Sequence, residues 1–177
     1  MARFLIPLES APRETRVAAS PETIKKLQAI GCNVFVEKGA GISAGFTDES
    51  FSKAGAELVP LGDQRAWSEA EVLLCVQQPK DELLGKLSKG ALIVGLLAPY
   101  MNNSLANSIK TKELSALALE LLPRISRAQS SDALSSQANI AGYKAVLLAA
   151  SALDRYFPML MTAAGTVQPA KVVVLGA

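Results

Sequence analysis

The sequence predicts an α/β protein built on a doubly wound parallel sheet. Short apolar runs alternate with stretches that favour helices, and the strongest runs, EVLLCVQ (71–77) and ALIVGLL (91–97), are apolar without interruption. Such strands are typical of parallel sheets covered by helices on both faces. Half of the 177 residues are apolar and only 5% are aromatic, which suits Ala-, Leu- and Val-rich layers better than a β-sandwich.

The first elements have clear boundary residues. RFLIPL (3–8) predicts a strand. Ser20 as N-cap and Pro21 at the first helical position then begin a helix, which Gly31 ends. The β-branched and aromatic run NVFVEK (33–38) predicts the second strand.

A glycine-rich loop (39–45) leads into a short helix that Asp48 caps and Gly55 closes. The loop lacks the spacing of a phosphate-binding turn and is more typical of a surface or partner-contacting loop. AELVP (56–60) predicts a weak strand, and the strong strand over 71–77 follows.

The remaining elements of the sheet continue this alternation. A short helix is expected over 79–87, followed by the strand over 91–97, a helix over 102–110 and a last strand over 115–122. The alternation assigns residues 1–130 to one N-terminal α/β subdomain of flavodoxin- or Rossmann-like type.

The C-terminal portion is organised differently. A long helix is expected from Asp132 to Phe157, and a Gly/Pro loop follows it. We interpret residues 131–165 as a long linking helix and loop. The run KVVVLGA (171–177) predicts a strand, so residues 166–177 are expected to begin a second domain.

Composition excludes several kinds of site. The net charge of +2, without a basic stripe, gives no reason to expect a nucleic-acid partner. The sequence has no histidine, which removes Ser-His and Cys-His nucleophiles and most zinc sites, and we expect no metal. Cys32 and Cys75 lie in apolar runs and are interpreted as reduced core thiols of a cytoplasmic protein. The apolar run over 145–153 is too short to cross a membrane.

The tail is the first functional motif. A β-branched strand that ends in Gly176 and Ala177 could open the G-x-G-x-x-G turn of a dinucleotide-binding unit. Many α/β strands end in glycine, so this signal alone is weak. The rest of such a turn is absent from these residues.

The most informative motif is PRISRAQSSDALSSQ (123–137), which we call the polar junction. It places two arginines, an amide, a carboxylate and several hydroxyls between a strand and a long helix. These groups can hold a flat, polar ligand. The alternative is that Asp132 is only a helix cap and the arginines are surface charges; composition alone leaves both open.

A second polar cluster, PRETRV (12–17), follows the first strand and contains Arg13, Glu14 and Arg16. The carboxyl ends of parallel strands face the binding crevice, so a guanidinium there could hold a carboxylate or carboxamide. A solvated charge cluster is an equally good interpretation.

Three runs together carry a family resemblance: PRETRVAASPETIKKL, RISRAQSSDALSSQANIAGYKAV and FPMLMTAAGTVQPAKVVVLGA. In this order they closely resemble the NAD(H)-binding domain I of the proton-translocating NAD(P)+ transhydrogenase α subunit, over the whole chain. The resemblance implies hydride transfer from NADH to NADP+, coupled to proton movement in the full enzyme. It also implies that 166–177 is the first strand of a truncated NAD-binding Rossmann subdomain, so that the chain is the first portion of domain I.

The resemblance assigns roles within the polar junction. Arg124 and Asp132 are expected to pair and orient the nicotinamide carboxamide, and Ser135 to hydrogen-bond it. Gln129 is expected to reach toward the NADP(H)-binding partner domain, and with Arg124 and Asp132 it forms the expected catalytic set. The other expected cofactor contacts are Ile125, Ser126, Ser130, Ser131, Gly176 and Ala177.

The same resemblance implies partners and location. We expect NAD(H) on this chain and NADP(H) on the β subunit, and a homodimer formed through domain I. A membrane domain is the other expected partner, so the protein would be cytoplasmic and peripheral to the membrane.

Two alternatives accompany this interpretation. In the related alanine dehydrogenases an arginine holds the substrate carboxylate while a lysine and a histidine act on it. Arg16 matches the arginine, but Gln77 and Leu96 occupy the other two positions, so alanine oxidation is not expected. The second alternative is a non-catalytic assembly module that keeps the fold and dimer surface without binding NAD.

Overall fold

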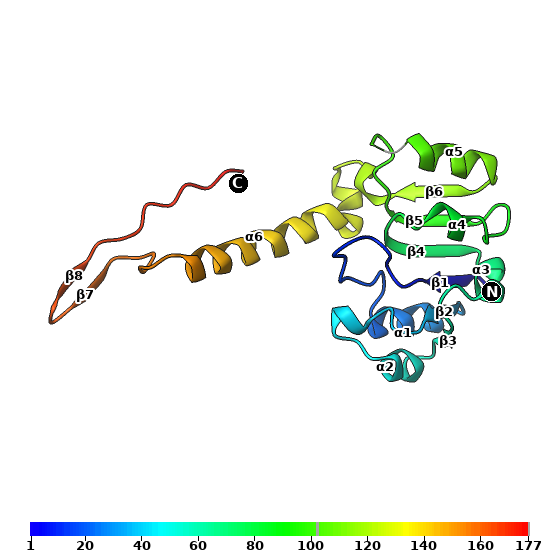
Figure 1. Cartoon of the computed structure of the whole chain (residues 1–177), viewed down its shortest axis with the longest axis horizontal. Helices are drawn as coiled ribbons and strands as arrows, with labels where there is room; N and C mark the ends of the chain where they lie inside the picture. The colour runs from blue at the N-terminus through cyan, green and yellow to red at the C-terminus, as the bar shows by residue number, and fades with distance from the viewer. Residues whose placement is uncertain (102, 177) are drawn as a thin grey trace. The chain divides into compact units, whose positions relative to one another are not determined.

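The computed structural model describes residues 1–101 and 103–176. The chain forms two compact units, Met1–Ser131 and Asp132–Ala177. Figure 1 shows the elements of both units along the chain.

The first unit contains a six-stranded, all-parallel sheet. Its order is β3-β2-β1-β4-β5-β6, so the chain winds outward from β1 in one direction and then, from β4, in the other. This confirms the predicted doubly wound sheet. The strands are β1 (Arg3–Ile6), β2 (Asn33–Glu37), β3 (Glu57–Val59), β4 (Val72–Gln77), β5 (Leu92–Leu96) and β6 (Ser115–Ala118).

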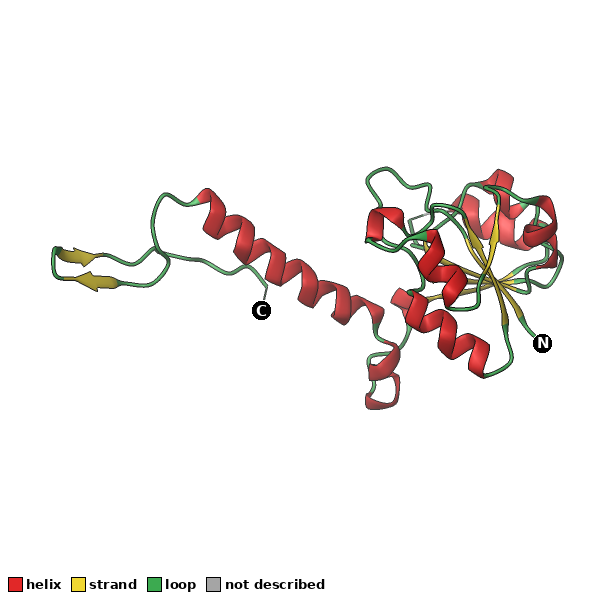
Figure 2. Ribbon diagram, turned by 90° about the horizontal axis from the view of Figure 1, so that it is seen from below, coloured by secondary structure: helices red, strands yellow, loops and turns green. Residues whose placement is uncertain are grey.

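Helices cover both faces of the sheet (Figure 2). Ile24 and Phe51, from the first two helices, pack on one face beside Val36, whereas Trp67 and Leu105 pack on the other. Alternate residues of β1, β2 and β4 therefore contribute to two separate cores. The helices are α1 (Pro21–Ala29), α2 (Asp48–Lys53), α3 (Gln64–Glu69), α4 (Asp81–Leu84) and α5 (Asn103–Thr111), with a short 3-10 turn, η1 (Ile42–Ala44).

Local signals set most of these boundaries. Ser20 caps α1 by accepting from the Thr23 N–H, as predicted, but α2 is capped by Thr47 rather than by Asp48. The helix α3 was not predicted, although Asp63 caps it by accepting from the Ala66 N–H at 2.8 Å. The predicted start of α5 at Asn102 lies outside the described residues.

One fully buried carboxylate ties three segments of this unit together. Glu37, at the end of β2, is 0% exposed. Its Oε1 accepts from Gly62 N and Trp67 Nε1, both at 2.8 Å, and its Oε2 accepts from Leu8 N at 2.9 Å. The loops after β1 and β3 are thereby fixed to the sheet together with α3.

The second unit begins with a long helix, α6 (Ala133–Ala152). The helix ends five residues earlier than predicted, because its C-cap Leu153 adopts an extended conformation. An antiparallel hairpin of β7 (Leu160–Thr162) and β8 (Gly165–Val167) follows, which the sequence analysis did not predict.

The strand predicted over 171–177 is not formed by its described residues. Residues 171–176 have no strand conformation, and Val173 is 82% exposed. A strand makes no hydrogen bonds within itself and needs a neighbouring strand to satisfy its backbone. The short hairpin β7–β8 does not supply one to this run.

Candidate functional site

The sheet reverses its winding between β1 and β4. In open α/β sheets, ligands bind outside the carboxyl ends of the strands at such a topological switch point. The loop after β1 and the loop after β4 meet at this edge. The first candidate site is therefore this crevice, and the second is the polar junction.

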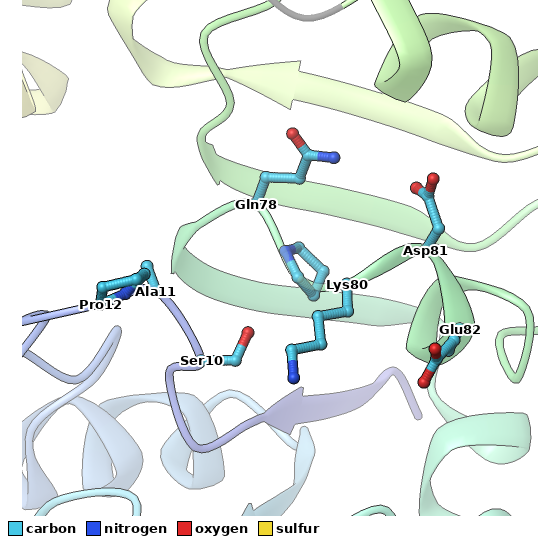
Figure 3. A pocket seen from close by; sticks show the side chains of 8 residues that line it. Ser10, Ala11, Pro12, Gln78, Lys80, Asp81 and Glu82 are labelled. Carbon is cyan, nitrogen blue, oxygen red and sulfur yellow. The ribbon is translucent and has the colours of Figure 1, made fainter.

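A cavity of about 500 Å³ lies at the switch point (Figure 3). Ser10, Ala11 and Pro12 of the loop after β1 form one wall, and residues 78–82 form the other. Lys80 brings a positive charge to this second wall, beside Asp81 and Glu82. The lining mixes both signs of charge and selects no single class of anion.

Glu14 is the centre of the polar cluster next to this cavity. Its side chain is only 5% exposed. It accepts from Arg16 Nε at 2.7 Å, Arg16 Nη2 at 2.6 Å and Gln77 Nε2 at 2.6 Å. The Arg16 hydrogen bonds lower the pKa of Glu14 to about 2 and raise the pKa of Arg16. Glu14, Arg16 and Gln77 therefore form a network, whereas Arg13 of the same cluster is exposed.

Glu9, in the loop after β1, connects this loop to β4. Its carboxylate accepts from Val76 N at 2.6 Å and Gln77 N at 3.2 Å, where the pairing of β4 with β5 is irregular. Burial raises the pKa of Glu9, although the two backbone N–H groups oppose the rise. Together Glu9, Glu14 and Glu37 fix the loop after β1, which is what gives the crevice a defined shape.

The lowered pKa of Glu14 predicts an acid dependence of stability. Its contribution is complete above about pH 4.5 and is lost as the pH falls through about 2. We expect Glu14→Gln to make the fall in unfolding free energy between these pH values shallower, by at most about 1.4 kcal/mol per pH unit, the limit for one proton.

Urea unfolding followed by the fluorescence of Trp67 measures this effect, because Trp67 is the only tryptophan in the sequence. The raised pKa of Glu9 acts with the opposite sign, and the Glu14 charge contributes to that rise, so the comparison is repeated with both proteins carrying Glu9→Gln. Glu49→Gln, on an exposed helix pair, is the matched control. Equal pH slopes for Glu14→Gln and the wild type would contradict the assignment.

The first segment of the polar junction, residues 123–131, belongs to the first unit. The chain leaves β6 through the 3-10 turn η2 (Leu119–Leu121). Residues 123–131 follow and contain a second 3-10 turn, η3 (Ser126–Ser131). The expected ligand-contacting side chains here are all exposed: Arg124, Ile125, Ser126, Gln129, Ser130 and Ser131. They remain available for a ligand or partner.

The second segment of the polar junction begins α6 in the second unit. Asp132 is the N-cap: its Oδ1 accepts from Ser135 N at 2.9 Å. Its Oδ2 accepts the Ser135 hydroxyl at 2.6 Å. The predicted capping by Asp132 is confirmed, and Ser135 is held by two bonds. The Arg124–Asp132 pair remains a prediction, since its residues belong to different units.

The expected cofactor contacts in the tail are placed only incompletely. Gly176 is exposed and has φ 81°, a left-handed conformation suited to a glycine turn. Ala177 lies outside the described residues. No strand leads into Gly176, so the strand-and-turn arrangement of a dinucleotide site is not formed by residues 171–176.

The sequence analysis missed three carboxylates at the carboxyl ends of strands: Glu9, Glu37 and Glu120. Each directly follows or ends an apolar run, and a charged residue in that position was the available signal. Within the described residues no cluster of His, Cys, Asp or Glu could hold a metal ion. No helix in that portion of the chain has both the length and the hydropathy that a membrane span requires.

Comparison with known proteins identifies the class. The family model "Alanine dehydrogenase/PNT, N-terminal domain" matches residues 5–141, and the corresponding C-terminal domain model matches residues 145–177. The chain therefore belongs to the alanine dehydrogenase/transhydrogenase family.

Within that family the chain is more similar to transhydrogenases. It is 45% identical to an NAD(P) transhydrogenase α subunit polypeptide of Rhodospirillum rubrum, covering 98% of this chain and 46% of the relative. It is 31% identical to the alanine dehydrogenase of Mycolicibacterium smegmatis, covering 97% of this chain and 46% of that enzyme.

A solved structure supports the same placement. The crystal structure of a transhydrogenase from Sinorhizobium meliloti matches with a TM-score of 0.88 and 43% identity, covering 95% of this chain and 50% of that one. The chain thus spans about half the length of each of these three relatives. The resemblance to the transhydrogenase α subunit is confirmed.

Proposed function

We propose that this chain supplies the nicotinamide-facing half of the NAD(H) site in an NAD(P)+ transhydrogenase α subunit. The full enzyme would move hydride between NADH and NADP+ and couple the transfer to proton translocation. One observation carries this choice within the family: the two positions that match the catalytic lysine and histidine of alanine dehydrogenases hold Gln77 and Leu96. Gln77 donates its amide to Glu14, and Leu96 stands at the end of the next strand.

Hydride transfer between two nicotinamide rings requires contact and orientation but no acid, base or metal. Alanine oxidation instead needs groups that act on the amino acid, and the sequence contains no histidine. The higher identity to the transhydrogenase subunit points in the same direction.

The residues of the polar junction fit a carboxamide. The Ser135 hydroxyl proton is donated to Asp132, so its oxygen lone pairs remain to accept from a carboxamide NH₂. Arg124 is exposed and carries N–H donors for the carboxamide oxygen. Bound NAD(H) would supply the hydride, while these residues fix the angle of its ring. Gln129 would contact the partner that carries NADP(H).

We further propose the partners of such a site. A helix that is apolar on all sides is normally covered by protein, yet Ile140, Tyr143 and Leu148 of α6 are exposed. A homodimer through this region would cover them. The β subunit would bring NADP(H), and its membrane domain would hold this chain at the cytoplasmic face of the membrane.

A second candidate function is an assembly module that keeps the fold of residues 1–130 and a dimer surface but does not bind NAD. The exposed, irregular backbone of 171–176 favours it. In both proposals residues 131–165 connect residues 1–130 to residues 166–177. On the first proposal residues 166–177 become the first strand of an NAD-binding Rossmann subdomain once further strands lie beside them.

NADH binding distinguishes these candidates. We expect residues 1–177 alone to bind NADH very weakly, because pyrophosphate binding needs a complete glycine turn and helix N-terminus. A chimera that continues residues 1–177 with the C-terminal half of the Rhodospirillum rubrum relative should bind at micromolar concentrations.

A fluorescence titration with NADH measures both proteins. The matched control is the same C-terminal half without residues 1–177. Equal micromolar affinity of the chimera and of residues 1–177 alone would contradict the need for a second half. A chimera without affinity would favour the assembly module.

A further inference from the structure

Glu120 is a carboxylate that the proposed function does not use. It lies in η2, between the end of β6 and residues 123–131 of the polar junction. Its Oε1 accepts from the backbone N–H of Ala98, in the turn after β5. Its Oε2 is buried and has no hydrogen-bond partner among the described residues.

The bond to Ala98 holds an unusual backbone. Ala98 has φ 44°, in the left-handed region that residues with a Cβ seldom adopt. The carbonyl of the same residue accepts from Met101 N at 2.9 Å, which closes the turn. Such strain persists only where surrounding contacts impose it, and the Glu120 carboxylate is the side chain bonded to this N–H.

Stability alone does not account for this arrangement. A buried carboxylate oxygen without a donor lowers stability, as does the left-handed Ala98. Glu120 lies where the chain leaves the sheet toward Arg124 and Gln129, and its bond ties this exit to the turn after β5. We propose that Glu120 is a positioning residue that, by clamping Ala98, fixes the direction in which residues 123–131 leave the sheet. This inference rests on the proposed function of the polar junction.

The first test uses the 177-residue chain and backbone NMR. The hydrogen bond from Ala98 N–H to Glu120 is expected to shift the Ala98 amide proton downfield. We expect Glu120→Ala to abolish this shift and to move the amide resonances of 123–131. Glu120→Gln, which keeps an acceptor, should restore both. Ala98→Gly with Glu120 in place should leave the 123–131 resonances close to the wild type, because glycine keeps both the left-handed φ and the N–H that Glu120 bonds. Unmoved 123–131 resonances in Glu120→Ala would overturn the proposal.

The second test uses the chimera of residues 1–177 with the C-terminal half of the Rhodospirillum rubrum relative. This chimera is mixed with the NADP(H)-binding domain from the same bacterium. We expect Glu120→Ala to slow hydride transfer about 10-fold with little change in the Kd for NADH, since misplacement acts on orientation rather than on binding. Glu120→Gln should recover most of the rate. An unchanged rate in Glu120→Ala would overturn the proposal. If the wild-type chimera transfers no hydride, the proposed function fails, and the NMR result still decides the role of Glu120.

Discussion

Replacing Glu37 by alanine is expected to destabilise the first unit by at least about 3 kcal/mol. The substitution leaves three N–H donors without their acceptor: the buried indole N–H of Trp67 and the partly buried backbone N–H groups of Leu8 and Gly62. Each unsatisfied buried donor costs about 1–3 kcal/mol, so even partial relief by entering water leaves a large loss. For a domain whose total stability is about 5–15 kcal/mol, that loss is severe.

Urea unfolding monitored by Trp67 fluorescence measures this loss. Glu37→Gln keeps one oxygen acceptor and should fall between the wild type and alanine, which keeps the test informative if the alanine variant does not fold. Glu49→Ala, on the surface, should change stability by no more than about 0.5 kcal/mol. A Glu37→Ala protein as stable as this surface control would show that the buried network contributes nothing.

The second large effect is expected in catalysis. In the chimera with its NADP(H)-binding partner, Asp132→Asn should slow hydride transfer about 100-fold, with a much smaller effect on NADH affinity. Asp132 holds both the N–H and the hydroxyl of Ser135, and an amide cannot accept at both places. The Ser135 oxygen would then turn away from the carboxamide, and small misplacements of reacting groups cost rates of this size.

Stopped-flow mixing of NADH-loaded protein with the NADP+-loaded partner measures the rate, and a fluorescence titration gives the NADH affinity. Gln129→Asn shortens the side chain expected to reach the partner and should slow transfer in the same way. Ser136→Ala is the matched control, because its hydroxyl bonds only the Asp132 backbone oxygen among the contacts of this cap. Unchanged rates in Asp132→Asn and Gln129→Asn would remove both residues from the mechanism.

The fold was predictable where local signals and burial agree. The apolar runs at 71–77 and 91–97 became β4 and β5, and Ser20-Pro21 began α1 as expected. The helix α3 was missed because its six residues are too few for a periodic pattern. The tail shows the opposite error: KVVVLGA has strand propensity, but a strand also needs a neighbour, which propensity does not supply.

The candidate site was predictable only in its residue types. The polar junction stood out because arginine, glutamine and aspartate crowd between a strand and a helix, and Asp132 does cap that helix. The sequence left open whether Arg16 was a solvated charge. Its bonds to Glu14 depend on the fold of the loop after β1, which Glu9 ties to β4 and Glu37 ties to β2. Contacts between residues far apart in sequence leave no local pattern to detect.

The most direct test of the central claim is hydride transfer by the wild-type chimera. NADH-loaded chimera is mixed with the NADP(H)-binding domain carrying an NADP+ analogue whose reduced form absorbs at a separate wavelength. In parallel, the chimera is supplied with NAD+ and alanine. The proposed function predicts rapid reduction of the analogue and no alanine-dependent formation of NADH. Alanine-dependent NADH without reduction of the analogue would contradict it.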